Sequence, residues 1–206
     1  MKVLLIVDVQ YDFLPGGALA VEEGDKIIPI INRLQEQFQF IVATQDWHPT
    51  KHGSFAANHR GHIVGDIIKL GGIDQILWPV HCVEETKGAE FHPSLNTKKW
   101  ANIIQKGTDA MVDSYSGFYD NNRKKNTGLA NYLKKHGVKE VYVVGLATDY
   151  CVKFTVLDSL SEGFKTFLIK DATRAVNIRP GDFDDAVKEM ADAGAIILDS
   201  LEVLNS

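Results

Sequence analysis

The sequence has little cysteine, no long hydrophobic run and no strong excess of either charge. Its two cysteines, Cys82 and Cys151, are too few for a disulfide framework and favour a reducing, cytoplasmic setting. Asp8 interrupts the first apolar run far too early for a signal peptide or a membrane-spanning helix. The net charge of -5 is small and the basic residues are scattered, so we expect neither nucleic acid nor an anionic membrane as a partner. This composition leaves homo-oligomer formation open.

The residues that are present predict one folded domain over residues 1–206. Apolar residues make up 45% of the chain, which is enough for one sizeable core. Short apolar runs, expected as strands, alternate with helical patterns; the runs lie at residues 2–9, 40–44, 101–107, 141–144, 164–169 and 195–198. This alternation predicts an α/β fold with a doubly wound, mostly parallel six-stranded sheet and helices on both faces, a Rossmann-like three-layer arrangement. A long, poorly periodic region at about residues 45–100 stands apart, and loops of that length are usually functional.

Cys151 follows one of these strands directly. A helical pattern continues from it to Gly163, with Thr148 or Asp149 as the expected N-cap. Cys151 would then lie in the first helical turn, where unpaired N–H groups and the helix dipole favour an anion and should lower the thiol pKa. The same N–H groups could hold an oxyanion. From its position alone, Cys151 is equally well interpreted as a buried cysteine that packs like a small apolar residue.

Three more polar residues end expected strands at the same edge of the sheet: Asp8, Asp46 and Lys106. Ligands of open α/β sheets bind at the carboxyl ends of the strands, and a carboxylate buried there without a role would be costly. A lysine beside a thiolate and a carboxylate would hold both ionised. Because four such residues coincide, we interpret them as a functional site, whereas nearby Asp12 is interpreted as a solvated or turn-capping carboxylate.

The long loop region contains candidate metal ligands. Asp46 and His48 are two residues apart, so in an extended segment both side chains point the same way and can grip one ion. His81 is the best candidate for a third ligand, with water completing a site suited to Zn²⁺, Fe²⁺ or Mn²⁺. An Asp-x-His pair is a weak signal by itself, and His52 is a secondary candidate. The remaining histidines of this region, His59, His62 and His92, are interpreted as loop residues, and Cys82 as a packing residue.

Ordered motifs spread over nearly the whole chain carry a family resemblance. They include Val7-Asp8-Val9-Gln10, Gln45-Asp46-Trp47-His48-Pro49, Trp78-Pro79-Val80-His81-Cys82 and the Gly145 to Cys151 stretch. With these motifs the sequence resembles the isochorismatase-like cysteine hydrolases and, among them, the nicotinamidase/pyrazinamidase family. The resemblance implies a metal-containing cysteine amidohydrolase that converts nicotinamide to nicotinate and ammonia through a thioester, in NAD salvage. It also implies activity on pyrazinamide.

The resemblance also assigns roles to residues. It implies a catalytic triad of Asp8, Lys106 and Cys151, and one divalent metal ion, zinc before iron or manganese, held by Asp46, His48 and His81. It implies an oxyanion hole made by the backbone N–H groups of Ala147 and Cys151, with a cis peptide between Leu146 and Ala147. It further implies aromatic walls around the substrate ring from Phe13, Trp78 and Tyr115. Tyr150 receives no role.

Four other functions compete with this interpretation. A sibling amidohydrolase would act on another small amide through the same residues. An isochorismatase proper is disfavoured, because its vinyl-ether hydrolysis does not need a nucleophilic cysteine. A metallohydrolase would activate water at Asp46, His48 and His81 and leave Cys151 incidental. A non-enzymatic flavodoxin-like binding module would leave the four polar strand-end residues without a purpose.

Overall fold

A six-stranded sheet forms the centre of the molecule. The computed structural model describes residues 1–205. The strand order is β5-β2-β1-β6-β7-β8, and every neighbouring pair is parallel. The strands are β1 (Lys2–Val7), β2 (Ile41–Asp46), β5 (Asn102–Lys106), β6 (Glu140–Leu146), β7 (Lys165–Arg174) and β8 (Ile196–Leu198). The predicted α/β fold with six strands is confirmed.

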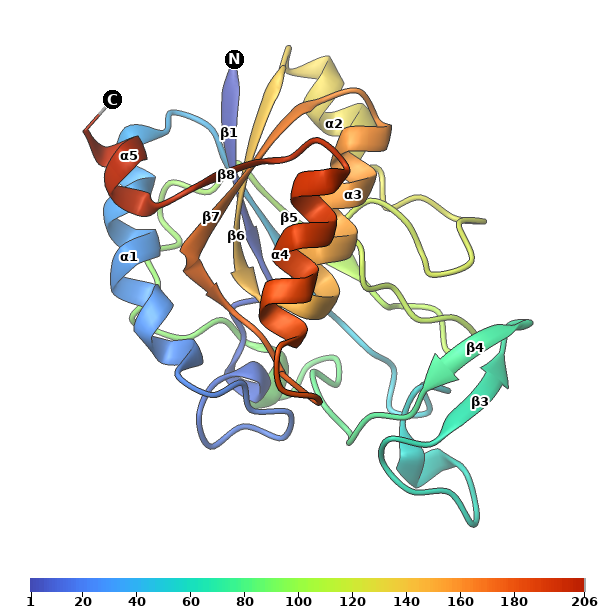
Figure 1. Cartoon of the computed structure of the whole chain (residues 1–206). Helices are drawn as coiled ribbons and strands as arrows, with labels where there is room; N and C mark the ends of the chain where they lie inside the picture. The colour runs from blue at the N-terminus through green and yellow to red at the C-terminus, as the bar shows by residue number, and fades with distance from the viewer. Residues whose placement is uncertain (206) are drawn as a thin grey trace.

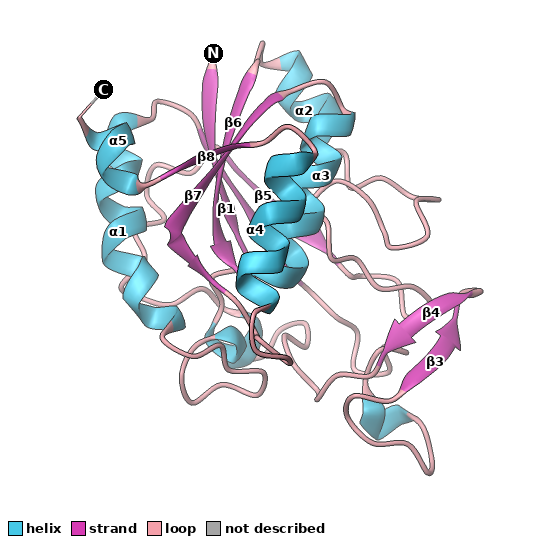
Figure 2. Ribbon diagram, viewed as in Figure 1, coloured by secondary structure: helices cyan, strands magenta, loops and turns pink. Residues whose placement is uncertain are grey.

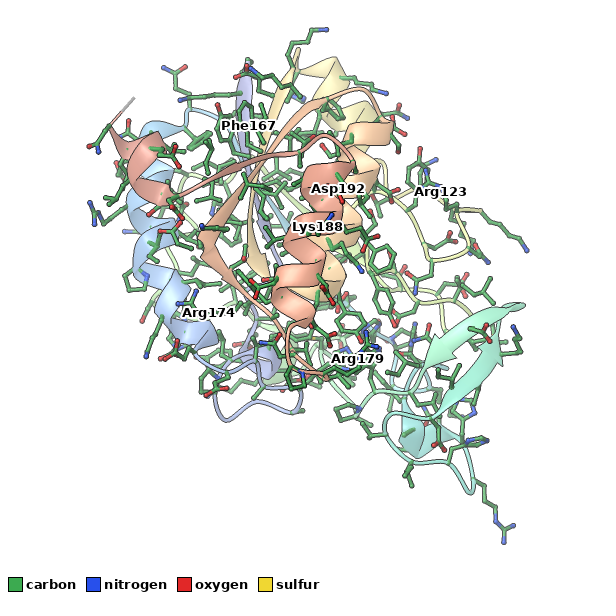
Figure 3. All side chains as sticks on the ribbon, in the orientation of Figure 1. Arg123, Phe167, Arg174, Arg179, Lys188 and Asp192 are labelled. Atoms are coloured by element: carbon green, nitrogen blue, oxygen red, sulfur yellow. The ribbon has the colours of Figure 1, made fainter. Side chains whose placement is uncertain are left out.

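Helices cover both faces of this sheet (Figures 1 and 2). They are α1 (Ile27–Leu34), α2 (Leu129–Lys135), α3 (Lys153–Ser161), α4 (Asp182–Asp192) and α5 (Ser200–Leu204). α1 and α5 lie on one face, and α2, α3 and α4 lie on the other. On α4, Lys188 and Asp192 pair on the outward side (Figure 3), whereas Ala186 and Met190 are buried against the sheet.

The side chains of β1 are buried on both faces of the sheet. Leu4 and Ile6 belong to the apolar cluster under α1, and Val3, Leu5 and Val7 belong to the cluster under α2 and α3. Because successive strand residues point to opposite faces, a strand between two helix layers must be apolar at every position. This requirement explains why the first run of the sequence is continuous rather than alternating.

The strand order reverses between β1 and β6. From β1 the chain moves outward to β2 and β5, and from β6 it moves the other way to β7 and β8. At such a reversal the connections leave in opposite directions and open a crevice beyond the carboxyl ends of the strands. Asp8 follows β1 and Cys151 follows β6, so the topology brings both residues to this crevice.

The region at residues 45–100 contains structure that the sequence pattern did not predict. β3 (Ile67–Leu70) and β4 (Ile73–Ile76) form an antiparallel hairpin, which projects from the body of the molecule in Figure 1. Gly71 and Gly72 form its turn with φ of 59° and 91°, values that favour glycine. The hairpin was not expected within this loop region, since two short strands joined by Gly-Gly give only a weak periodic signal. No helix among residues 1–205 is both long and apolar enough to cross a membrane.

Gly145 lets β6 approach β1 at the end of the sheet. Its φ is 116°, and a Cβ at this position would lie 2.1 Å from the carbonyl oxygen of Val7. The pairing of β6 with β7 also shifts register between Val143 and Gly145. Only glycine fits here, because any side chain would push apart the two strands that carry Asp8 and Cys151.

We expect Gly145→Ala to lower the free energy of unfolding by about 3 kcal/mol, since backbone strain is added to a clash with a central strand. Urea unfolding followed by circular dichroism measures this loss. Gly163→Ala is the matched control, because Gly163 also has a positive φ but has nothing within 4 Å of the added Cβ. It should cost only about 1 kcal/mol, and equal losses in the two variants would contradict the steric argument.

Candidate active site

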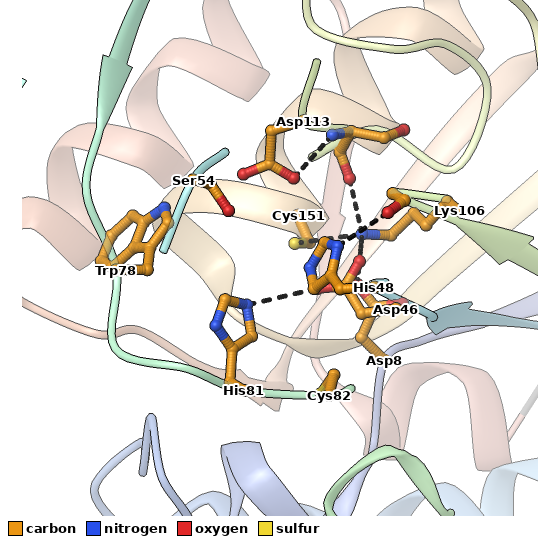
Figure 4. Close-up of polar contacts among 12 residues, drawn as sticks. Asp8, Asp46, His48, Ser54, Trp78, His81, Cys82, Lys106, Asp113 and Cys151 are labelled. Atoms are coloured by element: carbon orange, nitrogen blue, oxygen red, sulfur yellow. Dashed lines mark hydrogen bonds and ion pairs between the residues drawn. The ribbon is translucent and has the colours of Figure 1, made fainter. Parts of the chain in front are cut away.

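Four strand ends place an ion cluster in the crevice (Figure 4). The ammonium of Lys106 lies 2.9 Å from Asp8 Oδ2, 2.5 Å from Asp46 Oδ1 and 3.5 Å from Cys151 Sγ. All four side chains are buried. The structure therefore brings together the four residues that the sequence placed at one edge, and Lys106 is their common contact.

Asp8 is held as a buried carboxylate at the end of β1. It leaves the extended conformation with φ of 48°, which explains why β1 ends at Val7 rather than at the expected Val9. Thr44 Oγ1 donates a hydrogen bond of 2.6 Å to Asp8 Oδ1. Burial raises the pKa of Asp8 to about 6, against the opposing effect of Lys106. At neutral pH this carboxyl is ionised and is a stronger base than a solvated aspartate.

Lys106 remains a cation despite complete burial. Burial alone would lower its pKa, but Asp46 and Asp8 outweigh that effect and raise the pKa well above its ordinary value. Its ammonium also donates a hydrogen bond of 2.8 Å to the carbonyl of Ser114. The charge of Lys106 in turn keeps the pKa of Asp46 low, although burial of that carboxyl acts in the opposite direction.

Cys151 lies in a tight turn between β6 and α3. Residues Thr148–Val152 form one π-helical turn, and the preceding Leu146–Ala147 peptide is cis, as the resemblance implied. The expected N-cap was wrong: Ala147 occupies that position, and no side chain caps the turn. The carboxylate of Asp149 instead accepts hydrogen bonds from the backbone N–H groups of Val176 and Asn177, at 3.0 and 2.9 Å.

The pKa of the Cys151 thiol differs from the sequence-based expectation. Burial raises it well above its ordinary value, and the nearby Lys106 only partly offsets this. The position at a helix terminus predicts a lowered pKa. In this enclosed site, however, the loss of hydration destabilises a thiolate more than the Lys106 cation stabilises it. The resting side chain is therefore a thiol. A thiol in this state would act as a nucleophile only with the help of a base. The carboxylate of Asp8 is near enough, since one oxygen each of Asp8 and Asp46 and the sulfur of Cys151 all lie within 4.8 Å of one another.

Asp46, His48 and His81 form a second cluster that shares Asp46 with the first. Asp46 Oδ2 lies 3.5 Å from His48 Nε2 and 3.9 Å from His81 Nε2. The Nδ1 atoms of the two histidines lie 2.8 Å from the carbonyl oxygens of Gly107 and Pro79. An Nδ1–H that donates to a carbonyl leaves the Nε2 lone pair free for a metal ion.

This donor set fits a divalent metal ion. In the described part of the chain, His48 Nε2 is buried and makes no hydrogen bond. Burial and His48 lower the pKa of His81 to about 4, so that ring is neutral at physiological pH, as a ligand must be. One carboxylate and two imidazoles form a donor set that zinc accepts readily.

His52 lies beside this cluster rather than in it. Its ring centroid is 4.4 Å from that of His48, and its Nδ1 is 2.7 Å from Ser54 Oγ. Its potential ligand atom groups with those of His48 and Asp113, not with Asp46 and His81. Sequence reasoning missed Asp113, a buried carboxylate without a recognisable motif around it.

A cavity of about 350 Å³ opens onto both clusters. The expected aromatic residues Phe13, Trp78 and Tyr115 line it, together with Asp46, His81, Ala147 and Cys151. Leu19, Asp113, Tyr150 and Val176 also line it and were not anticipated. Its surface is mostly apolar and four aromatic side chains contribute to it, which suits a small flat molecule.

Gln10 explains one of the sequence motifs. Its side-chain amide accepts a hydrogen bond from the backbone N–H of Asp46 and donates one to the carbonyl of the same residue, both at 2.8 Å. The amide therefore fixes the end of β2 against the segment that follows β1. In this way Gln10 positions Asp46 through its backbone atoms rather than through its carboxylate.

The remaining residues singled out in the sequence lie away from the chemistry. Cys82 is fully buried in the core, and its backbone N–H donates a 2.7 Å hydrogen bond to Asp12 Oδ2. Asp12 Oδ1 also accepts a hydrogen bond from Ala18 N, so its carboxylate caps loop backbone as interpreted. His59 and His62 contact Gly53 and Asp66 in the loop region.

Comparison with known proteins places the whole chain in one family. Residues 2–202 match the family described as the isochorismatase domain. The chain is 48% identical to the nicotinamidase of Escherichia coli, over 95% of this chain and 93% of that protein. A solved structure described as an Acinetobacter baumanii nicotinamidase pyrazinamidease has a TM-score of 0.95 and 46% identity, covering 98% of this chain and 97% of that one. The pyrazinamidase of Pyrococcus horikoshii, solved in complex with zinc, has a TM-score of 0.77 and 42% identity, covering 96% and 98%.

We expect Lys106→Met to destabilise the fold by about 3–5 kcal/mol, because it leaves two buried carboxylates without their cation. The loss should shrink between about pH 8 and pH 5, since protonation of Asp8 removes one uncompensated charge. Chemical denaturation at both pH values measures it. Lys134→Met is the control, because that lysine pairs with Glu162 at the surface and should matter by less than about 1 kcal/mol. A loss in Lys106→Met that is independent of pH would contradict the electrostatic explanation.

Proposed function

The chain belongs to the isochorismatase family, and we infer that it is a nicotinamidase, which hydrolyses nicotinamide to nicotinate and ammonia. The observation that carries this inference is a thiol, a base and a cation, Cys151, Asp8 and Lys106, in contact beside a small aromatic cavity. The 48% identity to a nicotinamidase, which extends over 95% of this chain, supports the same substrate. Pyrazinamide, which has the same carboxamide on a six-membered aromatic ring, is proposed as a second substrate.

The thiol of Cys151 attacks the carboxamide carbon and transfers its proton to Asp8. Because the resting thiol is protonated, the proton leaves as the sulfur attacks, rather than before substrate binds. The resulting oxyanion is held by the backbone N–H groups of Ala147 and Cys151, in an environment with little water. Asp8 then gives its proton to the departing nitrogen, and ammonia leaves behind a thioester.

Water completes the reaction with the same residues. Asp8 takes a proton from the water as it attacks the thioester carbon, and then gives this proton to the Cys151 sulfur as the sulfur leaves. The product acid loses its own proton to solvent and becomes nicotinate. Nicotinate is released with the thiol restored, so the base and the nucleophile return to their starting states. Throughout the cycle Lys106 keeps its charge and stabilises each anion that forms beside it.

Asp46, His48 and His81 would hold one divalent metal ion, with zinc suited best and iron or manganese suited as well. The bound ion supplies a Lewis acid next to the cavity. Asp46 and His81 line that cavity directly, so the same cluster supports a second candidate function, a metallohydrolase in which Cys151 takes no part. We further propose a role in NAD salvage and a reducing, cytoplasmic setting, in keeping with two free cysteines.

Cys151→Ala should reduce ammonia release from nicotinamide by about 10⁴-fold or more, since no other group can form the thioester. Release by the purified, metal-loaded protein is measured before and after alkylation with iodoacetamide. Cys82→Ala is the control and should retain activity, because Cys82 lies in the core beneath the site. Activity that survives both Cys151→Ala and alkylation would favour the metallohydrolase. Absence of release from the wild type would mean that another amide is the substrate.

His81→Ala should lower the zinc content after equilibration with zinc and dialysis, and should remove most of the rise in Tm that zinc causes. A lost ligand weakens binding, and ligand binding stabilises the folded state in proportion to its affinity. Elemental analysis and thermal unfolding with and without zinc provide the two readouts. His92→Ala, a loop histidine outside the cluster, should behave like the wild type. Equal zinc binding by His81→Ala would exclude His81 as a ligand.

A further inference from the structure

A second concave region lies directly outside the aromatic cavity. This outer groove is lined by residues of the β3–β4 hairpin and of the first turns of α3 and α4, elements that are labelled in Figure 1. Ile67 and Ile76 line it from the hairpin, and Phe154 and Ile178 line it from the other side. Arg179, labelled in Figure 3, lies at its margin beside α4. Apart from Tyr115 and Tyr150, its lining residues do not line the inner cavity.

Tyr150 and Tyr115 line both the inner cavity and the outer groove. The two rings pack edge to face, with centroids 5.5 Å apart and planes inclined by 73°. Tyr150 also packs edge to face on Trp78, at 4.9 Å and 87°. The two tyrosine rings therefore form a wall between the space that takes the ring of the substrate and the open groove.

The two tyrosines of this wall are held very differently. The Tyr115 hydroxyl accepts hydrogen bonds of 3.0 Å from Gln75 Nε2 and from Trp78 Nε1, so Tyr115 and Trp78 support each other. Within residues 1–205 the Tyr150 hydroxyl makes no hydrogen bond, and the ring is half-buried. Burial raises the pKa of Tyr150 to about 12, so the ring stays a neutral surface. Removing the Tyr150 ring therefore leaves the hydrogen bonds that hold Tyr115 and Trp78 in place.

We propose that Tyr150 determines substrate size, closing the inner cavity to amides larger than a single six-membered aromatic ring. The proposal rests on the proposed function and deepens it by naming the substrate class: pyridine- and pyrazine-type carboxamides fit, and benzo-fused ones do not. Without the Tyr150 ring, the inner cavity continues into the groove next to Cys151. A larger aromatic amide then places its second ring in the groove while its carboxamide reaches the thiol.

The test compares nicotinamide with quinoline-3-carboxamide and isoquinoline-4-carboxamide, which add a fused ring on two different edges of the pyridine. In Tyr150→Ala the kcat/KM of at least one fused amide, divided by that of nicotinamide, should rise by about tenfold or more, because even one methylene changes selectivity by that amount. Tyr150→Leu, which fills more of the space, should give a smaller rise.

Two control variants distinguish loss of the Tyr150 ring from a general increase in the flexibility of the site. Tyr150→Phe keeps the ring and should keep the wild-type ratios. Ile178→Ala shortens an exposed side chain that lines only the groove, and should also leave the ratios unchanged. Ratios that stay at the wild-type value in Tyr150→Ala, or that rise equally in the controls, would overturn the proposal, as would efficient hydrolysis of both fused amides by the wild type.

A second readout does not need catalysis. The rate of Cys151 alkylation by N-(1-naphthyl)iodoacetamide, relative to iodoacetamide, should rise in Tyr150→Ala and stay constant in Tyr150→Phe, as followed by intact and peptide mass. Cys82 is fully buried and does not compete. If the wild type releases no ammonia from nicotinamide, the proposed function fails while this ratio still tests the wall. If nicotinamide is hydrolysed but neither ratio moves, only the wall proposal fails.

Discussion

The ammonium of Lys106 is the contact on which the site depends. It touches Asp8, Asp46 and Cys151 at once, and none of these groups is exposed to water that could compensate its charge. A buried carboxylate without a partner would take up a proton, and two of them side by side would repel each other. Because one lysine serves both, Asp8 stays basic and Asp46 stays anionic, and the two clusters become parts of one electrostatic unit.

Topology supplies the rest of the arrangement. Asp8 and Cys151 follow neighbouring strands at the reversal of strand order, and Gly145 allows those strands to meet closely at their last paired residues, Val7 and Gly145. The Gln10 amide, which exchanges two hydrogen bonds with the backbone of Asp46, and the Thr44 hydroxyl, which donates to Asp8, then hold these two residues in place. Strand pairing and hydrogen bonds from uncharged groups therefore hold the geometry of the candidate site, and these groups do not change protonation state with pH.

The fold and the membership of both clusters could be predicted from sequence, whereas their energetics could not. Apolar runs identify buried parallel strands, and the residue that ends each run lands at a common edge, which is why Asp8, Asp46, Lys106 and Cys151 were found together. The predicted direction of the Cys151 pKa shift was wrong, because the shift depends on burial and burial depends on packing by residues that are distant in sequence. Asp113 and Tyr150 were missed as cavity residues for the same reason, since no local pattern reports which loop faces a cavity. The β3–β4 hairpin carried a readable Gly71-Gly72 signal, but its strands are too short for periodicity to stand out.

The position of β1 has a consequence for how the protein is made. β1 is synthesised before the other strands of the sheet, yet one of its two neighbours in the sheet is β6, with Lys2 paired to Glu140. On the ribosome, β2 and β5 emerge before β6, so Asp8, Asp46 and Lys106 exist well before the thiol. During that interval one edge of a strand that is apolar from Val3 to Val7 has no partner, and unpaired apolar strands make nascent chains prone to aggregation. Cys151 is therefore the last of the four groups to be synthesised, and it directly follows β6, the strand that covers this edge.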